Sequence, residues 1–184
     1  MTALAQPIFW TPEIDPAAII LQARPSSSAS QLTAETLRAH IVREPEPELL
    51  RLDLSGELFD VSLLPSISDG SVAAVIPLDD MTPDRLTALA RFWAAATGRA
   101  VAPDPRMTTQ RLHRARQMLR AVDARHAGAI YRTIAEHLFP QHQIDTASWV
   151  GHPIRETTIR LARDGMKLVR CGYRSLLRRP RRDR

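Results

Sequence analysis

The stretch GAIYRTIAEHLFPQ, residues 128–141, decides which fold the second half of the chain is expected to adopt. Its apolar residues recur at helical spacing, which predicts a helix over 129–139 that Pro140 ends. The residues expected to face inward are Ile130, Ile134 and Leu138. Ala135 is small enough to let a second helix pack closely, as the first helix of a helix-turn-helix requires. The stretch therefore predicts the first half of such a motif.

The sequence on either side of this stretch predicts two more helices. One spans 108–125, and the other begins at Pro153 and extends to about Leu177. The apolar face of the first helix is expected to hold Leu112, Ala115, Leu119 and Val122. The thirteen residues 140–152 separate the last two helices, whereas a helix-turn-helix usually turns in about three or four. Spacing alone leaves two interpretations open, a helix-turn-helix with an extended connection and a plain three-helix bundle.

Charge is distributed unevenly between the two halves of the chain. Residues 1–105 hold 7 Arg and 14 Asp or Glu, a net charge of −7, whereas 106–184 hold 18 Lys or Arg and 6 Asp or Glu, a net charge of +12. A strongly positive region attracts polyanions such as nucleic acid or an anionic membrane. Only Lys167 among the 25 basic residues is lysine. A GC-rich genome would explain that bias, but it does not explain the clustering.

Basic residues follow the last predicted helix at steps of three or four. They are Arg160, Arg163, Lys167, Arg170, Arg174 and Arg178. At helical periodicity they occupy an arc of roughly 80°. Such a stripe can lie along a phosphate backbone, be a solvated face that covers apolar surface with its stems, or rest on a membrane. The +12 charge and the neighbouring helix-turn-helix candidate favour nucleic acid.

The helix that starts at Pro153 is the predicted recognition helix. Recognition helices place their N-terminal residues in the major groove, where Arg can bond guanine and Thr can contact a thymine methyl or a phosphate. The positive end of the helix also favours a phosphate. The residues predicted to bind DNA are Arg132, Arg155, Thr157, Thr158, Arg160, Arg163, Lys167 and Arg170.

The first hundred residues predict a small module of strands and one helix. The segments predicted as strands are 17–23, 49–54, 57–64 and 71–78. The middle two alternate around Ser55-Gly56, which predicts a β-hairpin. A helix is expected from near Thr82 to Gly98, with Asp79-Asp80 leading into it. Its apolar residues at helical spacing are Leu86, Leu89, Trp93 and Ala96.

The predicted fold class is α+β, a small N-terminal antiparallel β module with one helix followed by a C-terminal all-α, helix-turn-helix-like bundle. The boundary is placed in VAPDPRM, residues 101–107, where two prolines coincide with the change of charge sign. The expected divisions are an α+β module over 1–103, a DNA-binding domain over 107–179 and a disordered basic tail over 180–184.

The order of residues in the second half resembles the domain-of-unknown-function 2285 family. The resemblance covers about 107–179. Its most specific elements are Gly128-Ala129-Ile130-Tyr131-Arg132 with Ile134-Ala135, the lone Trp149, and Gly172-Tyr173-Arg174-Ser175-Leu176-Leu177. The N-terminal FWTPE, residues 9–13, is similar to the region that precedes this domain in full-length members. The resemblance implies a variant helix-turn-helix with an extended connection.

The same resemblance implies a role in gene regulation on mobile elements. One type in the family is the frameshifted excision activator of integrative and conjugative elements. Its DNA binding would carry over to the helix at Pro153 and the basic surface around it. The fullest activator form has a further N-terminal segment, which a separate protein would supply here. A second type is a short antiactivator that binds other regulators. We therefore expect a DNA-binding activator of excision and transfer genes, with a protein-binding antiactivator as the alternative.

The expected partners are double-stranded DNA and, for the acidic module, RNA polymerase or another regulator, while the oligomeric state is left open. No catalytic motif is present, so the chain is not expected to be an enzyme or to need a cofactor. His137 and His142 lie on either side of Pro140, and no metal site is predicted. Trp149 is interpreted as plugging a small core rather than stacking on a base. A single cysteine, Cys171, and the lack of a signal peptide or apolar span predict a cytoplasmic protein without a membrane partner.

Overall fold

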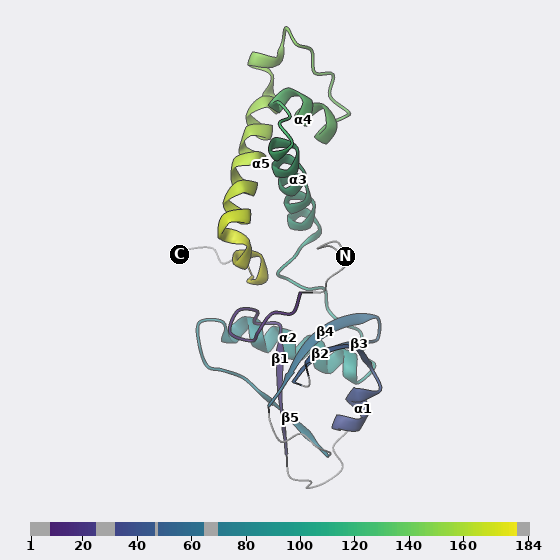
Figure 1. The fold of residues 1–184 in the computed structure, drawn as a ribbon. Helices are drawn as coiled ribbons and strands as arrows, with labels where there is room; N and C mark the ends of the chain where they lie inside the picture. The colour runs from purple at the N-terminus through teal and green to yellow at the C-terminus, as the bar shows by residue number, and fades with distance from the viewer. Residues whose placement is uncertain (1–7, 25–31, 47, 65–69, 180–184) are drawn as a thin grey trace. The chain divides into compact units, whose positions relative to one another are not determined.

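The computed structural model describes residues 8–24, 32–46, 48–64 and 70–179 (Figure 1). The chain forms two compact units, one of Met1–Pro103 with Leu177–Arg184 and one of Asp104–Leu176. The first unit holds a sheet and the second is helical, so the predicted α+β class is confirmed. The basic tail predicted over 180–184 lies outside the described residues.

A five-stranded sheet in the order β2-β3-β4-β1-β5 forms the centre of the first unit. Its strands are β1 (Ile19–Ala23), β2 (Ile41–Glu46), β3 (Leu49–Leu54), β4 (Glu57–Leu63) and β5 (Val72–Val75). Neighbouring strands are antiparallel except β1 and β4, which are parallel with Ile19 opposite Val61. The sequence did not predict β2, an edge strand that contains Pro45. Proline cannot donate a ladder hydrogen bond, and an edge strand tolerates it because one side of that strand has no neighbour to receive such a bond.

The predicted hairpin joins β3 and β4 through Ser55 and Gly56. Both residues have positive φ, 57° and 81°, as a tight hairpin turn that follows the twist of the strands requires. The Gly56 N–H donates to Asp53 Oδ1 at 2.9 Å and fixes the turn. Alternation then buries one face of each strand, with Leu50, Leu52 and Leu54 on β3 and Phe59 and Val61 on β4.

Helix α2 (Thr82–Ala96) packs on this buried face, and the short helix α1 (Ala34–Arg38) adds Leu37 to the same core. Phe92 meets Phe59 edge to face with ring centroids 5.6 Å apart. The buried residues of α2 include Ala88, Phe92 and Ala95, whereas Leu86 and Trp93 are 52% and 42% exposed. Two of the four residues that the apolar periodicity marked, Leu89 and Ala96, pack partly buried against the core. The buried face is therefore centred beside the predicted one, on Ala88, Phe92 and Ala95.

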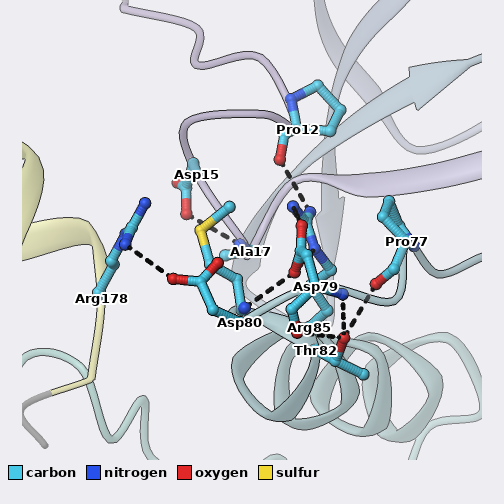
Figure 2. A network of polar contacts seen from close by, with 10 residues as sticks. Pro12, Asp15, Ala17, Pro77, Asp79, Asp80, Thr82, Arg85 and Arg178 are labelled. Carbon is cyan, nitrogen blue, oxygen red and sulfur yellow. Dashed lines mark hydrogen bonds and ion pairs between the residues drawn. The ribbon is translucent and has the colours of Figure 1, made fainter.

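A polar network secures the start of α2 (Figure 2). The buried Arg85 donates to the Pro12 carbonyl oxygen at 2.8 Å and pairs with Asp79 Oδ2 at 3.0 Å. Asp79 Oδ1 also accepts from the Met81 N–H at 2.8 Å, which confirms that the acidic pair leads into the helix. Arg178 reaches Asp80 at 3.5 Å. The network ties the N-terminal segment and the C-terminal residues of this unit to one helix end.

The second unit consists of three α-helices and two short 3-10 helices. They are α3 (Thr109–His126), α4 (Tyr131–Leu138), η2 (Trp149–Gly151), α5 (Pro153–Arg170) and η3 (Gly172–Leu177). In Figure 1 α3 and α5 lie side by side and α4 lies across one end of the pair. Their common core consists of Met118, Ala121, Ile134, Leu161 and Ala162. Two residues predicted to face inward, Leu119 and Ile130, are instead 54% and 57% exposed.

Close contact between α3 and α5 depends on Gly165. A Cβ at this buried position would lie 2.7 Å from the Met118 carbonyl oxygen and 2.8 Å from Val122 Cγ2. Helix α5 continues through Gly165 without interruption and ends at Arg170, so the helix predicted to extend to Leu177 is shorter. The residues from Gly172 form η3 instead.

Candidate nucleic-acid interface

The N-terminus of α5 is capped locally. His152 precedes the helix with extended backbone, and its Nδ1 accepts a hydrogen bond from the Ile154 N–H at 3.2 Å. Pro153 occupies the first helical turn, where its missing N–H costs nothing. Arg155 and Thr157 are half-buried here, and Glu156 is exposed. This end of α5 offers an arginine, a hydroxyl and a carboxylate beside the positive pole of the helix.

Ring contacts join the two ends of the long connection between α4 and α5. The rings of Phe139 and His142 lie 6.3 Å apart, and those of His142 and His152 lie 6.4 Å apart, each pair edge to face. These contacts bring the end of α4 next to the start of α5, although 140–152 separates them in sequence. Trp149 lies half-buried in η2 and is not part of the helical core.

Arg132 joins α4 to the same connection. It donates to Thr146 Oγ1 at 2.5 Å and lies 3.7 Å from Glu136. Its guanidinium is therefore engaged within the protein, which gives this predicted DNA contact a positioning role in the structure. Because Glu136 offsets part of its charge, Arg132 contributes less to an electropositive surface than the arginines of α5.

The structure contradicts the prediction for Thr158. This side chain is completely buried, and its hydroxyl donates to the Ile154 carbonyl oxygen at 2.9 Å, one turn earlier in α5. Helical geometry is the cause, since Thr158 shares the inward face with Leu161 and Ala162, whereas Thr157 lies one residue round the helix. Thr158 therefore belongs to the helix packing and is removed from the candidate DNA contacts.

A cationic stripe, defined as Arg160, Arg163, Lys167 and Arg170, covers the exposed side of α5 opposite its buried face. Among the described residues Arg160, Lys167 and Arg170 form no ion pair or side-chain hydrogen bond, and Arg163 lies 3.6 Å from Asp164. The stripe is shorter than predicted, because Arg174 belongs to η3 and Arg178 pairs with Asp80. Four adjacent cations, three of them without a counter-ion among the described residues, form a surface suited to polyanions.

A groove of about 540 Å³ adjoins the stripe where α5 meets the C-terminal end of α3. Its lining residues are Arg125, His126, Tyr131, Ala162, Arg163, Met166, Lys167 and Arg170. This set, called the cationic groove below, contains basic side chains from two helices. The side chains of Ala162 and Met166 give it an apolar floor.

A second groove, of about 250 Å³, is almost entirely apolar. It lies between the middle of α3 and the C-terminal part of α5 with η3, and it includes Leu119, Val169 and Tyr173. These three side chains are substantially exposed. We call it the apolar groove.

Other arginines of the helical unit serve its packing. Arg111 donates to the Arg106 and Ser175 carbonyl oxygens and so joins the start of α3 to η3. Partial burial lowers the pKa of its guanidinium from the ordinary value. Arg114 pairs with Asp164 on α5 at 3.0 Å. These two arginines add little to the outward-facing charge, because carbonyl or carboxylate oxygens already hold them.

Two predicted absences concern metals and membranes. No group of three His, Cys, Asp or Glu side chains within the described ranges is arranged to hold a metal ion. His137 Nδ1 lies 2.8 Å from the Thr133 carbonyl oxygen of its own helix, and Cys171 is exposed. None of the helices in the described part of the chain is both long and apolar enough to span a bilayer.

Sequence reasoning missed Arg125, His126 and Tyr131 as parts of the candidate interface. They come from the end of α3 and the first residue of α4, and the fold brings them beside α5. Arg125 and His126 are basic residues in the last turn of a helix, a position where they complement the helix dipole. Their position beside α5 could not be predicted, because the periodicity of one helix does not show which other helix its end will contact.

Comparison with protein families identifies the class of domain. A family model described as "T6SS, Transcription factor, DNA binding domain" matches residues 75–178, more than half of the chain. The match contains α2 to α5 together with η2 and η3. It begins at the end of β5, well before the start of the DNA-binding domain predicted from Met107. No curated protein and no solved structure matches the chain.

Proposed function

Since the chain belongs to the family of T6SS transcription factor DNA-binding domains, we propose that it is a DNA-binding regulator that binds duplex DNA through α5. The proposal assigns this binding to residues 107–179. It further makes the chain a cytoplasmic activator of the excision and conjugative-transfer genes of an integrative and conjugative element. The acidic sheet module would then contact RNA polymerase or another regulator.

The cationic stripe is the observation that carries the proposal. Three of its four cations are free of protein counter-ions within the described residues, and all four point away from the core. Cations in this state release condensed counter-ions from DNA when they meet phosphates, and that release dominates affinity. A solvated face without a ligand would not need charge of one sign along about three turns of the helix. The exposed residues beside the stripe offer few carboxylates to neutralise it.

Within this interface the residues have different proposed roles. Arg155, Thr157 and Arg160 lie in the first turns of α5, where they would meet base edges or the nearest phosphates. Arg163, Lys167 and Arg170 lie further along the helix, where they would meet the backbone. Arg132 would act by holding the connection in front of α5 through Thr146.

Affinity for an operator selected from random duplexes tests the assignment. Replacing Arg155 or Arg160 with alanine is expected to cost about 1–3 kcal/mol on the selected site and to relax sequence preference. Arg120→Ala is the matched control, because Arg120 is exposed on α3 and forms no ion pair among the described residues. Fluorescence anisotropy at several salt concentrations measures the effect. If both α5 variants bind the operator as tightly as the Arg120 variant, α5 is not the recognition helix.

The regulated genes require an experiment in the host. We expect deletion of the gene to lower the transcripts of excision and transfer genes, with chromatin immunoprecipitation placing the protein at their promoters. Decreased T6SS transcripts with unchanged transfer genes would instead assign the chain to the system that the family description names. Increased transfer transcripts would contradict activation.

The apolar groove favours a second candidate function, a protein-binding antiactivator. Leu119, Val169 and Tyr173 expose apolar surface on the helical unit without help from the cationic stripe. An antiactivator would lose binding to its target regulator in a Leu119→Asp variant and would keep it in an Arg160→Ala variant. The activator proposal expects the opposite ranking in DNA binding, so a pull-down beside the anisotropy assay separates the two functions.

A further inference from the structure

We propose that the cationic groove is a phosphodiester-binding site that holds the sugar-phosphate backbone of one DNA strand, apart from the first turns of α5. The inference rests on the proposed function, and it adds a second contact surface contributed by α3 and α4. It assigns roles to Arg125, His126 and Tyr131, for which the sequence pattern of α5 gave no reason.

The charge of the lining specifies an anion. Arg125, Arg163, Lys167 and Arg170 place four cations around one hollow, and the lining contains no Asp or Glu. Asp164 lies next to Arg163 in sequence and 3.6 Å from it, but it faces Arg114 of α3 at 3.0 Å and is not part of the groove. Bringing these cations together costs repulsion that a bound polyanion would relieve.

One of the groove cations is held in a fixed orientation. The Arg125 guanidinium stacks on the Tyr131 ring, with its carbon 4.6 Å from the ring centroid. Its Nη1 donates to the Ala129 carbonyl oxygen at 2.6 Å, and among the described residues its other N–H groups have no partner. An arginine placed in this way loses little side-chain entropy when it binds a phosphate.

The shape of the groove favours a polymer backbone over a single ion. Its volume of about 540 Å³ is larger than one phosphate group fills, and its lining includes Arg163, Lys167 and Arg170 from successive turns of α5. Ala162 and Met166 form an apolar floor beneath the basic rim. Deoxyribose rings can pack on such a floor while the phosphates on either side meet the cations, an arrangement that a small inorganic anion could not use.

The groove is also continuous with the cationic stripe. Arg163, Lys167 and Arg170 belong to both, so a strand that enters the groove remains beside α5. Backbone contacts of this kind fix the orientation of a protein on duplex DNA without carrying sequence information. The groove variants should therefore weaken binding to every sequence equally, unlike variants of Arg155 or Arg160.

Salt-dependent binding to the selected operator and to an unrelated duplex is the first test. Arg170→Gln and Arg125→Gln are each expected to lower affinity about fivefold near 0.15 M salt on both duplexes, and to reduce the slope of log K against log salt by about one. Arg120→Gln removes the same charge from the exposed face of α3. It should change the affinity and the salt slope much less than the groove variants do. Groove variants indistinguishable from Arg120→Gln would overturn the proposal.

Methyl NMR of the full chain labelled at methionine locates the ligand directly. Met166 lies on the groove floor and Met81 lies buried in the sheet unit. We expect the Met166 signal, assigned with Met166→Leu, to move when duplex DNA is added, while the Met81 signal stays in place. An unmoved Met166 signal at saturating DNA overturns the proposal. A shift of Met166 with inorganic phosphate but not with DNA overturns it too, and assigns the hollow to free phosphate.

The two proposals fail in different ways. If the wild type binds duplex and Arg160→Ala weakens binding but neither groove variant does, the groove assignment is wrong and DNA binding through α5 stands. If the wild type binds no duplex at any salt concentration, both fail together.

Discussion

The paired arginines of the sheet unit contrast with the unpaired cations along α5 in the helical unit. In the sheet unit Arg51, Arg85 and Arg91 each pair with a carboxylate, of Asp60, Asp79 and Glu57 respectively, at 2.6–3.1 Å. In the helical unit Arg160, Lys167 and Arg170 have no such partner within the described ranges. The first group joins segments that are distant in sequence, and the second leaves its charge available on the surface.

The contrast shows how to separate structural arginines from ligand-binding ones. Arg51 lies directly across the sheet ladder from Asp60, stacks on Phe9 at 4.3 Å and donates to the Ile8 carbonyl oxygen. The protein itself thus occupies the donors of this guanidinium, and the hydrogen bond that Arg51 donates to Asp60 raises the pKa of Arg51. Each side chain carries one positive charge in both groups, so the difference lies in the partners that the fold supplies.

The largest effect is expected at Arg85. Arg85→Met keeps most of the apolar stem but removes the bonds to Asp79 and Pro12, so the free energy of unfolding of the sheet unit should fall by about 2–4 kcal/mol. Urea unfolding followed by Trp10 and Trp93 fluorescence in a Trp149→Phe background measures this unit. The exposed Arg43→Met variant serves as control and should change stability by less than about 0.5 kcal/mol. Equal effects at both sites would abolish the distinction between paired and unpaired arginines.

The next effect concerns the helical unit and the space between its helices. Gly165→Ala would normally stabilise a helix interior by about 1 kcal/mol. Here the added methyl group meets the Met118 carbonyl oxygen, so a loss of about 1–3 kcal/mol is expected from overpacking. Gly151→Ala places its methyl group in open space and should be nearly neutral. Thermal unfolding by circular dichroism compares the two; a Gly165 variant more stable than wild type would show that the helices can separate.

Adjacent threonines offer a sharper comparison inside α5. Thr158→Ala removes a buried hydroxyl and methyl group and should cost about 1 kcal/mol of stability, yet leave operator affinity per folded molecule unchanged. Thr157→Ala is expected to do the reverse, with unchanged stability and weaker operator binding. Calorimetry and anisotropy on the same preparations provide both readouts. If only the Thr158 variant lost operator affinity, Thr158 would be a DNA contact after all.

The smallest effect is an acid dependence in the sheet unit. The hydrogen bond from Arg85, above all, lowers the pKa of Asp79 from its ordinary value of 3.8. A carboxylate with a lowered pKa in the folded state contributes stability above its unfolded pKa and loses it as pH falls through the folded pKa. The melting temperature of the wild type should therefore drop between about pH 5 and pH 2 more than that of Asp79→Asn. Parallel curves would show that the Asp79 pair does not contribute.

Much of the fold could be predicted because its signals are local. The hairpin was evident from alternation on both sides of Ser55-Gly56, and the three helices of the second unit from their apolar spacing. The missed elements, β2 and α1, depend on the rest of the sheet, since β2 carries a proline and α1 has only five residues. The buried face of α2 was also unpredictable, because Phe92 and its alanines fit the sheet better than the larger Leu86 and Trp93.

The candidate site was predictable along one helix and not between helices. The stripe on α5 follows from periodicity alone, and residues one position apart, such as Thr157 and Thr158, are separated only once the inward face is known. The groove needs Arg125 and Tyr131 to come within reach of α5, which depends on the angle at which α4 crosses the helical pair. No pattern in the sequence encodes that angle directly.

The ring contacts among Phe139, His142 and His152 have a consequence for how the connection can evolve. They connect the end of α4 directly to the start of α5. The residues between His142 and His152 therefore form a loop whose two ends are already in contact. The length of this loop and the angle between α4 and α5 consequently depend on different residues. Relatives could change the length or the charge of this loop to suit new operators or partner proteins, while the orientation of α5 relative to α4 stays the same.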